Sequence, residues 1–207
     1  MYKKLYINGY CHIKNNSISL NGNKITSEDK ELSFSKFAKL IYQHKELAYP
    51  KFFKMDNLCK LAFLATEILL ENHSIDTNLK KDMAIVLSNR AASLDTDRKH
   101  QTSISDKDSY YPSPAVFVYT LPNIAIGEIS IRHQIKGENV FFVSNTFNDT
   151  LIHQYATSLL RNGKSSNILC GWVDFDHENY NAFMYLLSEN GPIEYSSEFI
   201  KKTYLEN

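Results

Sequence analysis

Apolar positions in the first third of the chain predict a strand or hairpin followed by two helices. Lys3 to Ile13 alternates between polar and apolar residues, and a turn at Asn15-Asn16 separates it from a second short apolar run, Ile18 to Asn21. Ser33 is a suitable helix N-cap. The next residues recur on one helical face: Phe34, Phe37, Ala38 and Ile41. Between Met55 and Asn72, apolar residues at spacings of three and four predict a second helix with one buried stripe.

The middle of the chain combines one clear strand with a long polar segment. Met83 to Leu87 is a continuous apolar run, typical of a strand that is buried on both faces. Ser88 to Ser113 is polar and too long for a plain connection, so we expect it to be functional or partly disordered. Leu121 to Ile135 fits both periodicities, but Pro122 is tolerated in a first helical turn and favours a helix.

The last third predicts strands and helices in alternation. Val140 to Val143 is the strongest strand in the sequence, and Asn148 or Asp149 can cap a helix that continues to Leu160. Ile168 to Val173 predicts a buried strand, and Phe183 to Leu187 either a helix or a strand. This order predicts a single α/β domain over residues 1–207, with a mostly parallel mixed sheet covered by helices.

The composition argues against nucleic-acid binding and against a membrane-spanning segment. Lys plus Arg and Asp plus Glu both number 23, so the chain lacks the basic surplus of most nucleic-acid-binding proteins. It has no run of about 20 apolar residues that could span a membrane. The N-terminal residues do not resemble a signal peptide. Three widely spaced cysteines (Cys11, Cys59, Cys170) indicate free thiols in a reduced, cytoplasmic compartment.

The segment Ser113 to Asn123 resembles a stretch of the β-ketoacyl synthases, in which Ser-Pro-x-x-Phe leads to a helix that begins near an Asn. Other segments resemble further parts of the same enzymes in the same order. These are Tyr6 to Gly9 (opening strand), Pro50 to Glu71 (helix), Asp82 to Ser88 (second core strand), Val140 to Val143 (strand before the nucleophile) and Cys170 to Asp174 (strand after the nucleophile helix). The resemblance implies a thiolase-like layered fold that corresponds to one half of a ketosynthase. It is greatest to small stand-alone ketosynthase-like proteins of fatty-acid-like and aryl-polyene pigment pathways.

One departure from the family concerns the catalytic nucleophile. The family places a cysteine at the start of the helix that follows this strand, where the helix end favours the thiolate. Here Thr146 or Phe147 occupies that position, and no cysteine lies within twenty residues. The second half of the enzyme, which supplies two histidines, has no counterpart in 207 residues. We therefore expect no catalytic residue of the family type, and Thr146 is favoured as a turn residue.

Other chemistry-bearing residues favour structural interpretations. The seven histidines show no metal-ligand spacing, so we expect no metal, and nothing in the sequence indicates a cofactor. Asp174, Asp176 and His177 could form an acid/base or metal site, but a solvated turn after a strand is favoured. Trp172 and the aromatic-rich residues 110–119 could form a contact surface, or simply pack.

These observations predict a catalytically degenerate ketosynthase-like protein that forms a homo- or heterodimer. In thiolase-type dimers the strand that corresponds to Val140, Phe141, Phe142 and Val143 pairs with its counterpart across the dimer axis, so the resemblance implies a partner interface here. The expected partners are a ketosynthase, an acyl carrier protein or both, with a role like that of a chain length factor. Two alternatives remain: an acyl-transfer or hydrolytic enzyme that uses a residue other than cysteine, and a carrier-protein binding module.

Overall fold

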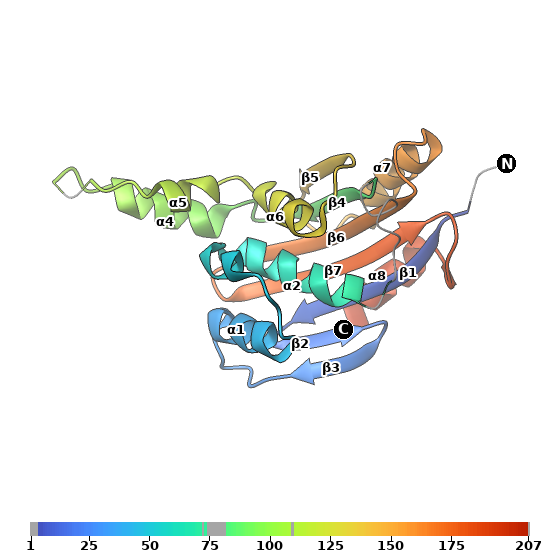
Figure 1. Cartoon of the computed structure of the whole chain (residues 1–207), viewed down its shortest axis with the longest axis horizontal. Coiled ribbons are helices and arrows are strands. Elements are labelled where there is room, and N and C mark those ends of the chain that lie inside the picture. The colour runs from blue at the N-terminus through green and yellow to red at the C-terminus, as the bar shows by residue number, and fades with distance from the viewer. Residues whose placement is uncertain (1–3, 72, 74–81, 109, 207) are drawn as a thin grey trace.

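A computed structural model describes residues 4–71, 73, 82–108 and 110–206, and it shows one twisted sheet between two layers of helices (Figure 1). The strands are β1 (Tyr6–Lys14), β2 (Ser17–Leu20), β3 (Asn23–Ser27), β4 (Ala84–Asn89), β5 (Asn139–Val143), β6 (Asn167–Asp176), β7 (Asn179–Ser188) and β8 (Ile193–Glu194). The helices are α1 (Phe34–His44), the 3₁₀ helix η1 (Pro50–Lys54), α2 (Asn57–Glu71), α4 (Leu94–Ile104), α5 (Pro114–Val118), α6 (Ile124–His133), α7 (Asp149–Arg161) and α8 (Ser197–Glu206). The predicted α/β class is confirmed.

The strand order is β3-β2-β1-β7-β6-β4-β5, with β8 added beside β1. Two strand pairs are parallel, β4 with β5 and β4 with β6. The five other strand pairs of the described chain are antiparallel. The expectation of a mostly parallel sheet was therefore wrong. Tight turns explain the difference, because Asn15 and Asn16 adopt φ of 50° and 55° and His177 adopts 58°. Such left-handed residues join neighbouring antiparallel strands.

Two hydrophobic cores hold the helices against the two faces of the sheet. In β4, Ile85 and Leu87 point into the core under α1, α2 and α6, whereas Ala84 and Val86 point into the core under α7 and α8. Because neighbouring side chains of a strand point to opposite faces, a strand covered on both sides must be apolar throughout. This explains the continuous apolar run predicted to be a buried strand.

The helix predictions from the first third of the chain are confirmed, with small corrections at their ends. Ser33 is the N-cap of α1, but its side chain makes no capping hydrogen bond, and the Phe34 N–H donates to Glu178 instead (2.7 Å). The second helix begins at Asn57 rather than Met55, because Asp56 accepts the Cys59 N–H (2.8 Å) as a cap does. Its predicted last residue, Asn72, lies outside the described residues.

The polar segment after β4 is not a loop, because α4 occupies much of residues 88–113. Thr96 is the only buried residue of α4, and its hydroxyl donates to Asp56 (2.6 Å). Ser93, just before the helix, donates to the Thr120 carbonyl (2.7 Å). Polar contacts thus hold this helix, so apolar periodicity could not reveal it. The ambiguous segments are resolved as helix α6 and strand β7.

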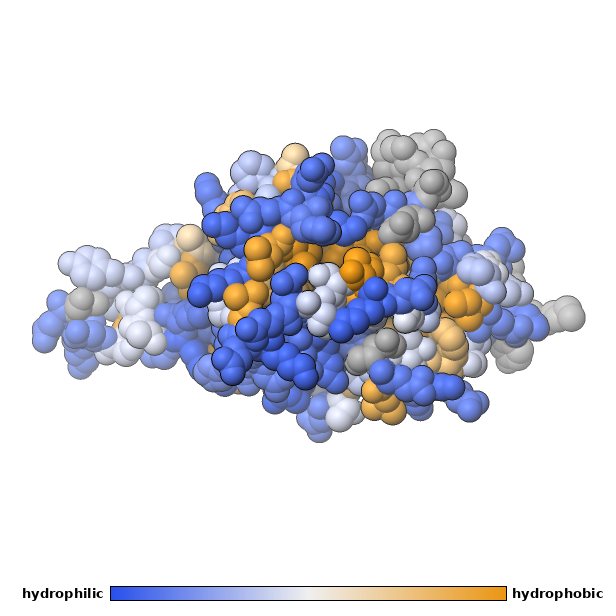
Figure 2. Space-filling view, turned by 90° about the horizontal axis from the view of Figure 1, so that it is seen from below, coloured by the Kyte–Doolittle hydropathy of each residue, from blue (hydrophilic) through white to orange (hydrophobic). Residues whose placement is uncertain are grey.

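Seen from below, the molecule shows an apolar strip bordered by hydrophilic side chains (Figure 2). This face includes α1 and the β2–β3 hairpin, where Leu40 and Ile25 are 43% and 41% exposed. Ile25 belongs to β3, which forms the edge of the sheet opposite β5. No helix in the described part of the chain is long and apolar enough to cross a membrane.

A buried ionic cluster joins α2 to α6. Arg132 donates to both carboxylate oxygens of Glu67 (3.0 Å each), and His133 Nε2 lies 2.8 Å from Glu67 Oε1. Burial raises the pKa of the Glu67 carboxyl, but the hydrogen bonds from His133 and Arg132 outweigh it and lower the pKa to about 2. The folded state therefore favours the ionised carboxylate, which stabilises the junction of the two helices.

Replacing Glu67 should destabilise the fold far more than replacing an exposed carboxylate of the same helix. Glu67→Gln removes the buried carboxylate that pairs with Arg132 and His133, so we expect a loss of about 3 kcal/mol in the free energy of unfolding at neutral pH. Glu71→Gln, which breaks the exposed pair with Lys45, should cost less than about 1 kcal/mol. Urea unfolding of the wild type and both variants measures the two losses in the free energy of unfolding.

The effect of Glu67 should also depend on pH in one direction. Its contribution is complete above the ordinary carboxyl pKa of 4.5 and disappears as pH falls towards about 2. The stability difference between wild type and Glu67→Gln should therefore shrink over this range. Equal losses for Glu67→Gln and Glu71→Gln at neutral pH would contradict the account.

Candidate functional site

The candidate site lies where β4, β5 and β6 end. These parallel strands bring their carboxyl ends to one edge of the sheet, which is where α/β domains usually bind ligands. The turn after β5 is fastened to the end of β4, because the Ser144 N–H donates to the Asn89 carbonyl (2.9 Å). The sequence resemblance places the expected nucleophile position, Thr146 or Phe147, in this turn.

Thr146 has an exposed side chain and lies three residues before α7. Its carbonyl accepts a hydrogen bond from the Ser144 hydroxyl (3.0 Å), and Asn148 caps α7 by accepting the Leu151 N–H (3.0 Å). In the described chain the Thr146 hydroxyl itself has no hydrogen-bond partner. A threonine without an adjacent base is a poor nucleophile, so the geometry favours a turn residue.

His153, the histidine that follows in α7, does not serve as that base. Its ring stacks on Tyr195 with centroids 3.9 Å apart and planes 3° apart, and its Nε2 lies 3.4 Å from the Thr157 hydroxyl. Burial lowers the pKa of His153. The imidazole is thus directed to Tyr195 and Thr157, away from the turn.

Phe147 is half-buried and anchors the turn to the core. Its ring centroid lies 4.6 Å from that of Tyr204, 5.8 Å from Phe183 and 6.2 Å from Trp172. Tyr204 belongs to α8, so the last helix supplies part of this aromatic cluster. The residue beside the expected nucleophile position therefore acts in packing.

Asp149, the first residue of α7, holds α8 in place. It is 2% exposed, accepts a hydrogen bond from the Ser197 hydroxyl, and lies 3.4 Å from Lys201 Nζ. Both partners belong to α8. A buried carboxylate needs such partners, and its place at a helix N-terminus stabilises it further. This contact and the aromatic cluster close the space between the turn and α8.

The acidic residues at the end of β6 also serve the structure. Asp174 accepts the N–H groups of Arg90 and Ala91 (3.0 and 2.9 Å) and so fixes the loop after β4. Asp176 pairs with Arg98 at 2.5 Å, and that hydrogen bond lowers the pKa of Asp176. Arginine neutralises these carboxylates, and the residues described by the structure contain no group of metal ligands. The favoured interpretation of a solvated turn was wrong for the two carboxylates, because Asp174 and Asp176 belong to β6 and their side chains are only 14% and 18% exposed. Only His177, which is 73% exposed, lies in the turn that follows.

All three cysteines are buried and unpaired. Burial raises the pKa of Cys11 to about 12 and raises those of Cys59 and Cys170 as well. None of the three lies in the turn after β5, and a buried thiol with a raised pKa is unreactive.

β5 forms one edge of the sheet, since β4 is its only neighbour in the described chain. Phe141 packs against the core under α2 and α6, while Val140 and Phe142 pack against the core under α7. Val143 is 58% exposed. The Ser144 N–H points to β4, and backbone groups alternate sides along a strand, so the N–H groups of Val143 and Phe141 point outward.

The expected aromatic contact surface is only half present. Trp172 is 4% exposed and packs against Phe147, so it is a core residue and not a surface residue. Residues within α5 and on either side of it are strongly exposed. They are Tyr110 (59%), Tyr111 (79%), Phe117 (60%), Val118 (49%) and Leu121 (56%). With α4 they form an arm that extends beyond the sheet in Figure 1. No sequence signal distinguished these exposed residues from the buried tryptophan.

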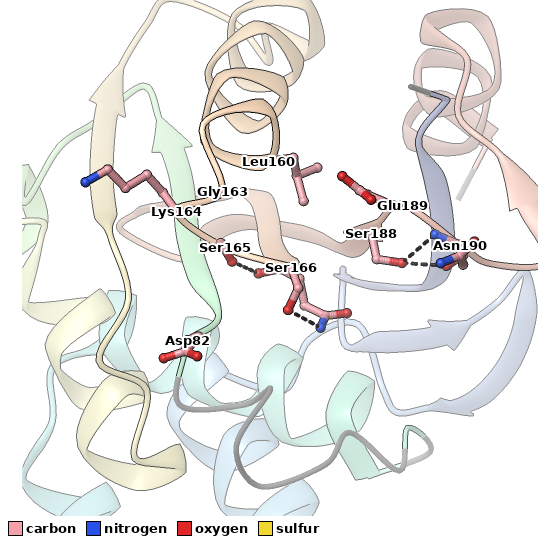
Figure 3. A pocket seen from close by; sticks show the side chains of 10 residues that line it. Asp82, Leu160, Gly163, Lys164, Ser165, Ser166, Ser188, Glu189 and Asn190 are labelled. Carbon is pink, nitrogen blue, oxygen red and sulfur yellow. Dashed lines mark hydrogen bonds between the residues drawn. The ribbon is translucent and has the colours of Figure 1, made fainter. Parts of the chain in front are cut away.

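A polar cleft of about 730 Å³ lies at the opposite ends of the strands, among the loops after α7 and β7 (Figure 3). Its side chains include Asp82, Lys164 and Ser165, with Ser188 on the other side. The Ser165 hydroxyl donates to Asn167, and that of Ser188 donates to Asn190. These hydrogen bonds hold the two loops in place. The residues that line the cleft do not form a catalytic group of side chains.

No family model matches the sequence, and no curated protein matches it. Solved structures do match its fold. The structure described as the ishigamide ketosynthase/chain length factor has a TM-score of 0.68 and 16% identity, and the match covers 89% of this chain and 62% of that chain. The ketosynthase ApeO in complex with its chain length factor ApeC, from Xenorhabdus doucetiae, has a TM-score of 0.61 and 15% identity, over 91% of this chain and 80% of that chain.

A third match is AntDE:AntF, a type II polyketide synthase acyl-carrier protein in complex with its ketosynthase. Its TM-score is 0.63 at 14% identity, over 92% of this chain and 64% of that chain. The chain thus spans less than two thirds of the length of the first and third matches. These matches confirm the resemblance at the level of the fold: the chain has the thiolase-type fold of ketosynthases and chain length factors.

Proposed function

We propose that this protein is a catalytically degenerate ketosynthase-fold subunit. It pairs through β5 with a ketosynthase that elongates carrier-bound acyl chains, and it acts there as a chain length factor does. The observation that carries this proposal is the combination of an intact fold, a nucleophile position without a nucleophile, and an apolar sheet edge without a neighbour in the described chain.

The turn after β5 supports the absence of catalysis. Claisen condensation on this fold needs an activated thiolate and groups that stabilise the oxyanion. Thr146 has no base beside it, Phe147 packs in the core, and the described cysteines are buried elsewhere. A subunit of this kind can contribute surface and shape to an enzyme without performing the chemical step.

The edge of the sheet supports pairing. An unpaired apolar edge strand exposes N–H and C=O groups that invite another strand, and monomeric proteins usually blunt such edges with charges or proline. β5 carries neither, since its sequence is Asn-Val-Phe-Phe-Val. Ile131 of α6 and Val143 at the end of β5 are also exposed apolar residues (61% and 58%).

The names of the matched structures fit this role. Two of them describe a ketosynthase together with a chain length factor, and one describes a ketosynthase with its acyl carrier protein. The assignment to fatty-acid-like or aryl-polyene biosynthesis rests on the sequence resemblance of three short segments: Thr120 to Asn123, Gly127 to Ile129 and Gly171 to Asp174.

The isolated protein should not condense acyl chains. Incubation with acyl- and malonyl-carrier protein, followed by mass spectrometry, should give no product above background, because thiol and histidines are missing. The three thiols should alkylate slowly in the native protein and fully after unfolding, since burial raises their pKa values. Condensation product that Thr146→Ala abolishes would refute the degenerate assignment.

Val143→Asp should abolish association through β5. The Val143 side chain is exposed, so the substitution leaves both cores intact, whereas a charge on Phe141 or Phe142 would also disturb packing. Light scattering coupled to size-exclusion chromatography, with and without a full-length ketosynthase, measures the effect. We expect the complex in wild type and its loss in the variant.

The matched control is Ile25→Asp, which places the same charge on an exposed apolar residue of the other edge strand. It should leave the complex unchanged. A wild type that is monomeric at every concentration and binds no ketosynthase would refute the proposed interface, as would equal losses in both variants.

A further inference from the structure

The sequence contains asparagine followed by glycine at four places, and the structure holds these pairs differently. They are Asn8-Gly9, Asn21-Gly22, Asn162-Gly163 and Asn190-Gly191. In such a pair the backbone nitrogen of the glycine can attack the side-chain amide of the asparagine, because glycine has no Cβ to obstruct the approach. The attack requires an asparagine side chain and a glycine N–H that hydrogen bonds do not hold elsewhere. The hydrogen bonds of each pair therefore decide whether it can react.

The two pairs near the N-terminus are held through their asparagine side chains. The Asn8 amide donates to the Ser188 hydroxyl (2.8 Å), and Gly9 is buried within β1. The side-chain oxygen of Asn21 accepts the Tyr10 N–H (2.9 Å). Neither side chain can turn towards the following nitrogen without the loss of its hydrogen bond.

The pair at the end of α7 is held mainly through its glycine. The Gly163 N–H donates to the Leu160 carbonyl (3.1 Å) in the bond that closes the helix. The Asn162 amide also lies 3.4 Å from the Ser158 hydroxyl. A backbone nitrogen whose proton is engaged in this way is a poor nucleophile, since the proton must be lost before attack.

The fourth pair lies in the exposed loop between β7 and β8, and no described residue hydrogen-bonds to the Asn190 side chain or to the Gly191 N–H. The Asn190 carbonyl accepts a hydrogen bond from the Ser188 hydroxyl (Figure 3). Ser188 is 8% exposed and is fixed by its contact with Asn8. The Asn190 carbonyl and the Gly191 nitrogen belong to one peptide group, so this donor stabilises the negative charge that the group carries once its proton is lost.

We propose that Asn190 is a site of spontaneous deamidation that the Ser188 hydroxyl promotes. The deprotonated Gly191 nitrogen bonds to the side-chain carbonyl carbon of Asn190. The bond from that carbon to the amide nitrogen breaks, and ammonia leaves with the proton. Water then opens the cyclic succinimide at either carbonyl and gives aspartate or isoaspartate, without oxidation or reduction. This site is independent of the proposed pairing through β5.

The product changes the loop in two ways. It adds a negative charge to the polar cleft, which Asn190 and Lys164 both line. Isoaspartate also inserts an extra carbon into the backbone shortly before β8, whose Ile193 and Glu194 pair with β1. The modification therefore alters both the cleft and the attachment of β8.

The test compares the four pairs in one sample of the full chain, incubated at neutral pH, by peptide mass spectrometry with fragmentation that identifies isoaspartate. In urea all four should react at similar rates, because each asparagine precedes glycine. In the native protein Asn190 should react about tenfold or more faster than the other three, whose hydrogen bonds must first break. A native rate at any other pair that equals or exceeds that of Asn190 would overturn the proposal.

Variants test the part played by Ser188. Ser188→Ala should slow the native reaction at Asn190 about tenfold and leave the rate in urea unchanged, whereas Ser188→Thr keeps the hydroxyl and should restore it. Asn190→Gln should remove the product, because glutamine would have to form a larger ring. Low rates at Asn21 and Asn162 show that each variant stays folded. A folded Ser188→Ala protein that reacts at Asn190 as fast as wild type would refute the promotion by Ser188.

Discussion

The interaction on which this molecule depends is the pairing of β4 with its two neighbours. β4 is buried on both faces and lies between β6 and β5, so it joins the antiparallel body of the sheet to its edge. Everything beyond β4 depends on that parallel pair: β5, the turn at Thr146 and the start of α7. The same pairing leaves the backbone N–H and C=O groups of β5 that point away from β4 without a neighbouring strand in the described chain. Fold and proposed interface are thus consequences of one strand order.

The turn after β5 is held against helix α8 of the same chain. Phe147 packs on Tyr204, and Asp149 binds Ser197 and Lys201, so α8 covers the start of α7. The exposed face of α7 is polar, with His153, Gln154 and Arg161 beside a shallow cleft. A helix buried between two layers would need apolar residues on both sides. Helix α7 instead has one apolar face, which packs on the sheet, and one polar face, which is exposed to solvent.

Local patterns predicted the elements whose burial decides their sequence. β4, β6, α1 and α7 were expected close to their observed positions, because a buried stripe or a two-sided strand leaves a periodic signature. The antiparallel pairing of β7 with β1 and β6 was not predicted, since strand partners are set by contacts far apart in the chain. Helix α4 was missed because polar contacts hold it, and Trp172 looked no different in sequence from an exposed aromatic residue. At the candidate site, the absence of a cysteine near Thr146 could be read from the sequence, whereas the packing of Phe147 and the contact of the turn with α8 could not.

Hydrogen exchange at β5 tests the central claim most directly. The N–H groups of Phe141 and Val143 point away from β4, so in a free monomer they should exchange quickly, while that of Phe142 is held by the β4 pairing. If β5 pairs with another subunit, the exchange of Phe141 and Val143 should slow markedly when the partner ketosynthase is added or the protein concentration is raised. Phe142 serves as the internal reference. Rapid exchange of Phe141 and Val143 under all these conditions would contradict the account.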